Sequence, residues 1–173
     1  ADAAAARMDE GGRTAPTDDL ARDIALGAIK YATLRGSIFQ DSVFDKEKAL
    51  SFEGDSGPYL QYTHARILSV LEKAKGIGVM PSIEHAPEVP YEIEKTLYRF
   101  EEVVKEALTD RAPHKVTVYL TELAGAFNTF YGKEVIADAS DTNAPYKAAI
   151  ANAVRITLRN GLWTLGIKAP NKM

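Results

Sequence analysis

The chain has no cysteine among its 173 residues, which excludes disulfide bonds and thiolate metal sites. It also has no apolar run approaching the roughly 18 residues that a membrane-spanning helix needs. Its three histidines, His64, His85 and His114, are scattered and have no carboxylates at metal-ligand spacing. No glycine-rich phosphate loop follows a strand, and no serine has a plausible base partner. We therefore expect no catalytic centre and no metal site in this chain.

What is present is an ordinary globular composition, with 46% hydrophobic and 26% charged residues. The net charge of −3 argues against binding to nucleic acid by bulk electrostatics alone. The charges are unevenly distributed, however: residues 144–173 hold five basic side chains and no acidic ones, whereas residues 84–110 hold eight acidic ones. The two segments could orient a polyanion on one face, or they could be solvated helix faces that pair with each other.

The N-terminal region predicts a leader and one helix. Residues 1–16 are rich in alanine, glycine and charge, and we expect a flexible leader without an export signal, which favours a cytoplasmic location. Thr17 is a typical helix N-cap, and Gly36 is expected to close the helix. Its apolar face is formed by Leu20, Ile24, Leu26, Ile29 and Tyr31. A loop over 37–51, with a possible extended piece, is expected next.

Four more helices are predicted along the rest of the chain. They span about 58–75, 91–109, 113–132 and 143–165, separated by glycine- or proline-marked joins and by a loop over 133–142. In the two middle ones, which begin at 91 and 113, apolar residues recur at spacings of three and four. These residues are Ile93, Leu97, Phe100, Val104 and Leu108, then Val116, Leu120, Leu123, Phe127 and Phe130. The sequence thus predicts an all-α bundle of about five helices.

The segment 57–66, GPYLQYTHAR, is the most informative stretch. Pro58 favours the first turn of a helix, on which Tyr59, Tyr62 and Arg66 share one face. Two phenols and a guanidinium suit stacking on unpaired bases and gripping a phosphate. The alternative is that both tyrosines simply pack at the edge of the core, as aromatic stripes at helical spacing usually do.

Residues 44–71 resemble the start of the C-terminal domain of class I arginyl-tRNA synthetases. The end of the chain, NGLWTLGI followed by APNKM, is similar to the terminus of the same family. The resemblance covers roughly residues 20–173. It implies an anticodon-binding domain of the DALR type over 51–173, with residues 17–50 as the helix and loop that link it to a catalytic domain.

The resemblance also implies roles for particular residues. Tyr59, Tyr62 and Arg66 match positions that face the anticodon loop, and Tyr131 matches a base-stacking aromatic. Met173, with its free carboxylate, matches a terminus that approaches the same loop. Two further positions are not expected to stack on bases. Val135 stands where some relatives have an aromatic residue, and we expect Trp163 to lie in the core.

The family's two catalytic signatures are absent from this sequence. The resemblance therefore implies a C-terminal piece that binds no cofactor and is inactive alone, with ATP and magnesium belonging to the parent ligase. The implied partners are arginine tRNA, through its anticodon loop, and the parent's own catalytic domain, in a monomer. Arginine anticodons share the middle cytosine, so we expect that base to be read most strictly.

Two alternatives stay open. One is the corresponding domain of another class I synthetase, such as the cysteine enzyme. The other is a helical protein-interaction module without an RNA role, with the acidic segment 91–109 as its docking face.

Overall fold

The computed structural model describes residues 2–4, 17–41 and 43–173. Residues 2–4 of the expected leader form a helical turn whose Ala4 packs with Ile24, and residues 5–16 lie outside the described part. The elements that follow are α2 (Asp18–Leu34), α3 (Lys46–Ala49), α4 (Gly57–Gly76), α5 (Glu92–Tyr98), α6 (Phe100–Thr109), α7 (His114–Lys133) and α8 (Ala144–Thr164). The prediction of an all-α bundle is confirmed, since no strand occurs within the described ranges.

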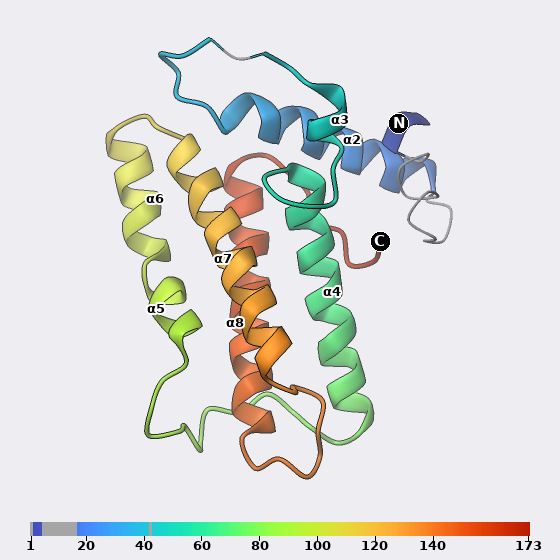
Figure 1. Ribbon diagram of the computed structural model, residues 1–173, viewed down its shortest axis with the longest axis vertical. Coiled ribbons are helices and arrows are strands. Elements are labelled where there is room, and N and C mark those ends of the chain that lie inside the picture. Colours follow the sequence, from blue (N-terminus) through green and yellow to red (C-terminus); the bar gives the residue numbers. More distant parts are fainter. Residues whose placement is uncertain (1, 5–16, 42) are drawn as a thin grey trace.

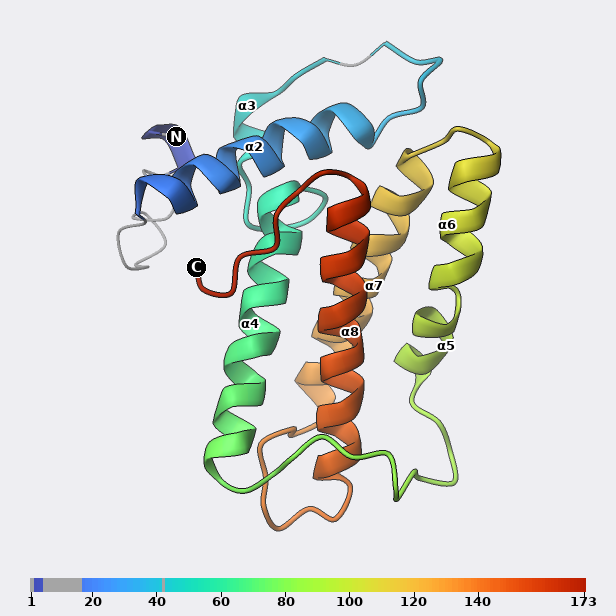
Figure 2. The same ribbon diagram turned by 180° about the vertical axis from the view of Figure 1, so that it is seen from behind.

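Three long helices, α4, α7 and α8, run side by side and form the body of the molecule (Figures 1 and 2). The shorter α5 and α6 follow each other along α7, and α2 lies across one end of the bundle (Figure 1). After α8 the chain turns and runs beneath α2 toward α4 (Figure 2). This arrangement brings both ends of the described chain to the same end of α4.

The residues that begin and end these helices are those that local chemistry favours. Thr17 caps α2 by accepting a hydrogen bond from the Leu20 amide, and Ser56 caps α4 by accepting one from the Tyr59 amide. Gly166 has a φ of 68°, the left-handed conformation that ends a helix at little cost for glycine. The predicted helix ends at these positions agree with the structure.

The prediction for 91–109 is wrong in one respect, because the expected single helix is two. Arg99 interrupts the segment, and its amide bonds back to Thr96 in a tight turn before α6 begins. The new direction places Ala107 in the core, and it leaves Leu108 81% exposed instead of on the buried stripe. Unbroken apolar spacing hid the break, since neither proline nor glycine marks it.

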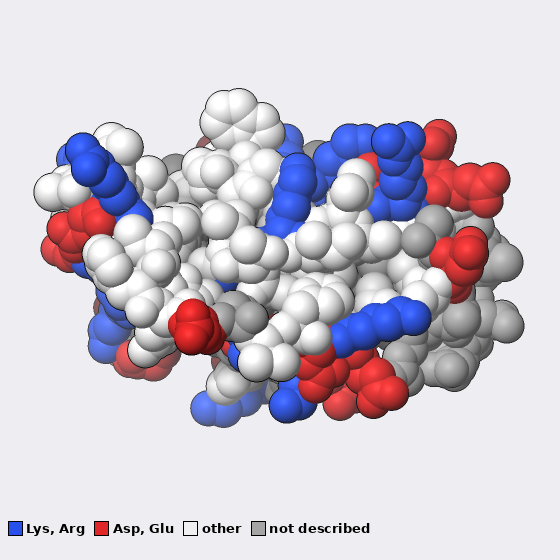
Figure 3. Space-filling model, turned by 90° about the horizontal axis from the view of Figure 1, so that it is seen from above, with Lys and Arg blue, Asp and Glu red and all other residues white. Residues whose placement is uncertain are grey.

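Two smaller differences concern the α2 region. The segment 37–51 includes the short helix α3, capped by the Asp45 carboxylate, where the sequence predicted only a loop. Leu26 and Ile29 are exposed, because the buried side of α2 is formed by Ala21, Ile24, Ala28 and Tyr31. Seen from this end, the surface has a broad uncharged area among interspersed charges (Figure 3).

The core is built mainly by α7 and α8, with α4 against them. The five predicted stripe residues of α7 are all buried, as are Val154, Leu158 and Leu162 of α8. No helix in the described ranges combines the length and the apolar character that crossing a membrane requires.

Within the described part of the chain, no ion pair joins the acidic segment to the basic final helix, although the Tyr146 hydroxyl of α8 donates to Glu94. Among the described residues, Glu101 pairs with Lys105 on α6 itself, and Glu106 and Asp110 pair with Lys115 of α7. On α8, Lys147 pairs instead with Glu134 and Asp141 of the preceding loop. Of the two alternatives, the one in which these faces pair with each other is therefore not supported by the ion pairs of the described residues.

The helices α2 and α4 cross at two glycines. A Cβ on Gly57 would lie 2.5 Å from the carbonyl oxygen of Gly27 and 3.0 Å from the Tyr31 Cβ. A Cβ on Gly27 would in turn lie 2.7 Å from the Gln61 side-chain oxygen. Glycine at both positions lets the two backbones approach, and the crossing holds α2 over the first turns of α4.

Gly57→Ala should therefore destabilise the protein by about 1–3 kcal/mol, the usual cost of overpacking, because the obstructing atom belongs to backbone that cannot rotate away. Urea unfolding followed by circular dichroism measures this. Gly125→Ala on α7 is the matched control, since nothing lies within 4 Å of its added Cβ. We expect it to stabilise α7 by about 0.5–1 kcal/mol. Equal stabilities for the two variants would contradict the close crossing.

Candidate nucleic-acid interface

Tyr59 and Arg66 of α4 are joined by a side chain of α7. The Asn128 amide nitrogen donates to the Tyr59 hydroxyl oxygen at 2.8 Å, and the Asn128 oxygen accepts from the Arg66 guanidinium at 3.4 Å. Both α4 side chains are half-buried. Burial raises the pKa of Tyr59, against the opposing effects of Asn128 and Arg66, so its hydroxyl keeps its proton at neutral pH. The expected shared face of α4 is thus confirmed for these two residues.

Arg66 also reaches the predicted stacking residue. Its guanidinium carbon lies 4.7 Å from the centroid of the Tyr131 ring, a cation–π contact. The Tyr131 ring also stacks on Phe127, with centroids 5.9 Å apart. Tyr131 is therefore already engaged in stacking within the domain, and the guanidinium of Arg66 is a planar, charged surface next to it.

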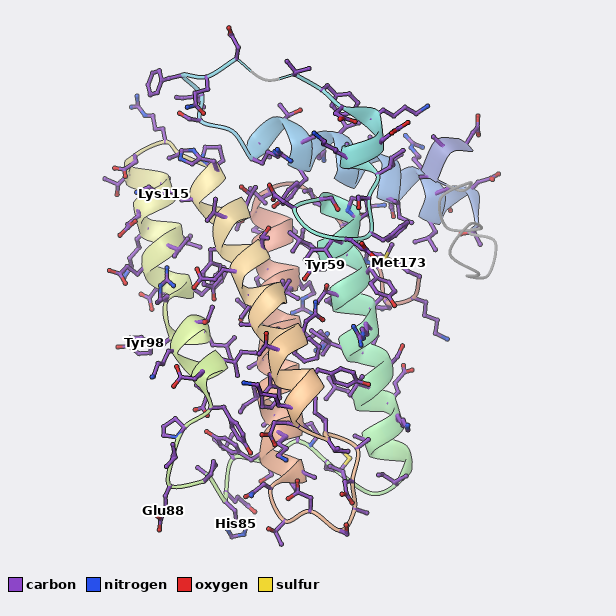
Figure 4. The ribbon with its side chains drawn as sticks, viewed as in Figure 1. Tyr59, His85, Glu88, Tyr98, Lys115 and Met173 are labelled. Carbon is purple, nitrogen blue, oxygen red and sulfur yellow. The ribbon has the colours of Figure 1, made fainter. Side chains whose placement is uncertain are left out.

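Tyr62 belongs to a neighbouring cluster. Its ring meets the Phe52 ring edge-on at 6.3 Å, and Phe52 packs in the small apolar cluster that also contains Met173 and Ile24. Figure 4 shows Tyr59 and Met173 at a similar level on the two sides of α4. The five predicted site residues thus form two adjoining groups: Tyr59, Arg66 and Tyr131 between α4 and α7, and Tyr62 with Met173 near the end of the chain.

The C-terminal segment is held against α4 by two buried polar side chains. The Gln61 amide donates to the carbonyl oxygen of Lys168 at 2.8 Å, and His64 Nδ1 donates to that of Pro170 at 2.9 Å. Lys168 also forms an ion pair with Asp23 of α2. These contacts position the end of the chain, and Met173 with it, beside α4 and α2.

His64 is a fully buried histidine whose Nε2 has no hydrogen-bond partner. Burial lowers the pKa of His64; the bond to Pro170 opposes this shift, and Arg155 and Arg159 of α8 add to it. The ring is therefore neutral in the folded protein. The bond from Nδ1 to Pro170 gives this histidine a structural role in holding the C-terminal segment.

Because the folded pKa is depressed, His64 should make stability depend on pH. Its contribution is complete above the unfolded value of about 6.5, and it should decline as the pH falls below that value, since the unfolded chain then binds the extra proton. His64→Asn keeps a donor for Pro170 and removes the titration. Urea unfolding between pH 7.5 and 5 should show wild-type stability falling more steeply than that of the variant, and parallel curves would contradict this assignment.

Trp163 corrects a prediction, because it is 78% exposed and does not lie in the core. The buried residues of α8 include Val154, Leu158 and Leu162, and Trp163 is one position, or about 100°, away from that line. Val135, in the loop after α7, is also exposed.

Two residues of the interface were missed by the sequence analysis. Gln61 is fully buried on α4 and Asn128 is half-buried on α7, and their partners are distant in sequence. A polar residue on the same side of α7 as Phe127 and Tyr131 was the available signal for Asn128. Within the part of the chain that the structure describes, no group of three or more potential metal ligands occurs.

The arrangement of these side chains is suited to binding unpaired nucleic-acid bases. It offers a guanidinium plane, two half-buried phenols and hydrogen-bond donors on one side of the bundle, which suits planar, unpaired bases with anionic linkages.

Comparison with known proteins agrees with this geometry. The model of the "DALR anticodon binding domain" family matches residues 60–173. The arginine–tRNA ligase of Pyrococcus furiosus is 36% identical over 165 residues, covering 90% of this chain and 26% of the relative. That of Thermococcus kodakarensis is 39% identical with the same coverage.

A solved structure gives the same result. The arginyl-tRNA synthetase of Thermus thermophilus superposes with a TM-score of 0.83 at 33% identity, covering 99% of this chain and 30% of that one. The chain therefore spans about a quarter to a third of the length of these relatives. With the family model matching most of its length, the chain belongs to the DALR anticodon-binding domain family.

Proposed function

We propose that this domain binds the anticodon loop of arginine tRNA through the face formed by α4, α7 and the C-terminal segment. The observation that carries the proposal is the cluster of Arg66, Tyr131, Tyr59 and Asn128, which presents a stacked cation and a phenol from two helices. Such a cluster, in a chain that matches arginine–tRNA ligases over 90% of its length, fits recognition of splayed loop bases.

The energetics of the proposed site are favourable despite the net charge of −3. Stacking contributes about 1–3 kcal/mol per base and does not need a basic domain. Arg66 adds a charged donor where a base or phosphate would lie, and Tyr62 and Met173 extend the surface toward the end of the chain. We propose all five of Tyr59, Tyr62, Arg66, Tyr131 and Met173 as tRNA-binding residues.

The wider role follows from the relatives. We infer that residues 51–173 form the anticodon-binding unit and that residues 17–50 connect it to the catalytic domain of a parent arginine–tRNA ligase. That parent would use ATP and magnesium to charge arginine tRNA as a cytoplasmic monomer, and the present piece, without the catalytic signatures, would be inactive alone. The crossing of α2 over α4 supports a connection that is fixed to the binding unit.

The deciding experiment is binding of this chain to arginine tRNA and to the same tRNA with its middle anticodon cytosine changed to uracil. We expect clear loss of affinity on that single change. Equal binding to both would contradict anticodon reading. The salt dependence separates the alternatives, because phosphate-dominated binding weakens steeply as the salt concentration rises. An affinity that stays the same at high salt, and that is no greater for tRNA than for other ligands, would instead favour a protein-interaction module.

A further inference from the structure

Asn128 lies between two donors of the proposed site and has only one way to satisfy both. Its side-chain amide faces the Arg66 guanidinium on one side and the Tyr59 hydroxyl on the other. A guanidinium has donors and no acceptor, so the amide atom that faces Arg66 must be the oxygen. The amide NH₂ must then face Tyr59.

This orientation determines what Tyr59 can offer to a ligand. Because the Tyr59 oxygen accepts the hydrogen bond from Asn128 at 2.8 Å, its own O–H is left to donate elsewhere. Burial keeps that phenol protonated. Arg66 uses one N–H on Asn128 and retains others. Arg66 can therefore only donate, and Tyr59, whose oxygen already accepts from Asn128, has its O–H as the group left to offer to a base.

A pair of donors distinguishes the two pyrimidines. The Watson–Crick edge of cytosine carries two adjacent acceptors, N3 and O2. The edge of uracil carries a donor, N3–H, at the first of these positions. A site that presents donors to both atoms is satisfied by cytosine, whereas uracil brings two donors together and leaves both unpaired, which is the costly situation for polar groups removed from water.

We propose that Asn128 is a positioning residue that sets specificity: it orients Tyr59 and Arg66 as paired donors, so that the site accepts cytosine and rejects uracil. This inference rests on the proposed function and adds to it a residue and a hydrogen-bond polarity. It concerns the middle anticodon base, at which all arginine anticodons carry cytosine.

The test compares discrimination rather than affinity. Asn128→Asp has almost the same shape and still accepts from Arg66, but its carboxylate also accepts the Tyr59 O–H, so this donor turns away from the ligand. We expect the ratio of the Kd values for the uracil and cytosine forms of arginine tRNA to fall about tenfold in this variant. Asn152→Asp is the matched control, because Asn152 holds Arg155 of α8 in the same manner at 3.0–3.1 Å. Its ratio should equal that of the wild type.

Tyr59→Phe supplies a second and independent measurement. It removes the outward O–H directly, so it should lower the same ratio, and adding Asn128→Asp to it should lower the ratio less than Asn128→Asp does in the wild type. Circular dichroism confirms that each variant is folded. If the wild-type chain prefers the cytosine form and either Asn128→Asp or Tyr59→Phe prefers it to the same degree, the inference is overturned and the proposed function stands. A wild-type chain that does not discriminate overturns both.

Discussion

Arg66→Ala should raise the Kd for arginine tRNA by about 10- to 100-fold, which is the largest binding effect that we expect from a single side chain. The guanidinium is the one group that connects the Tyr131 ring and the Asn128 amide. Removing it deletes a cation, a stacking plane and the partner of Asn128 at once. Electrophoretic mobility shift or fluorescence anisotropy with labelled tRNA measures the change.

Arg66→Lys separates the parts played by charge and by shape. Lysine keeps the positive charge but has no plane and no fork of donors, so it should recover only a fraction of the lost affinity. Arg22→Gln, an exposed arginine on α2, is the control for loss of one charge and should change the Kd little. A folded Arg66→Ala chain that binds as tightly as the wild type would contradict the proposed interface.

The salt dependence of these variants adds a distinct readout. If Arg66 contacts a phosphate, its removal should reduce the slope of log K against log salt by about one. If it stacks on a base, affinity falls while the slope stays near that of the wild type. The guanidinium plane beside Tyr131 favours the second result.

The local parts of this molecule were predictable, because each depends on a few neighbouring residues. Pro58 and Thr17 marked helix starts that the structure confirms. The break at Arg99 could not be read, because the apolar spacing continues through it and no breaker residue stands there. The prediction that Trp163 lies in the core is wrong, although its position relative to Leu158 and Leu162 already put it off the buried line.

The candidate site shows the same division. The shared face of Tyr59 and Arg66 follows from helical spacing within α4, so the sequence alone predicts it. The contacts that orient these residues come from α7, 62 positions or more away, and no local pattern reports such pairings. Met173 illustrates this point as well: its place beside α4 depends on Gln61 and His64, whose partners are backbone carbonyls at the far end of the chain.

The largest effect on stability should come from Lys147, which lies in the first turns of α8. Its side chain is only 9% exposed, and its ammonium lies 2.5 Å from a Glu134 oxygen and 2.8 Å from an Asp141 oxygen. Burial disfavours its charged form, but the bonds to Asp141 and Glu134 outweigh that effect and raise the pKa of Lys147. The same bond to Lys147 lowers the pKa of Asp141. This triad ties the loop between α7 and α8 to the start of α8.

Lys147→Met should destabilise the protein by about 2–3 kcal/mol at pH 7, less than for a fully buried pair, because it leaves two facing and partly solvated carboxylates without their cation. The pH dependence identifies the cause. Asp141 has a depressed folded pKa, so its contribution is complete above about 3.9 and is lost as the pH falls below that value. The difference between wild type and variant should therefore be largest at neutral pH and shrink toward pH 3.5.

Urea unfolding at pH 7 and at pH 3.5 measures this difference, and Lys105→Met is the matched control. Lys105 pairs with Glu101 on the surface of α6, where both side chains are more than 70% exposed. Solvent screens such a pair, so its loss should leave stability unchanged. If Lys147→Met cost no more than Lys105→Met, the triad would not hold the loop in place. If the cost of Lys147→Met were the same at both pH values, it would come from packing rather than from charge.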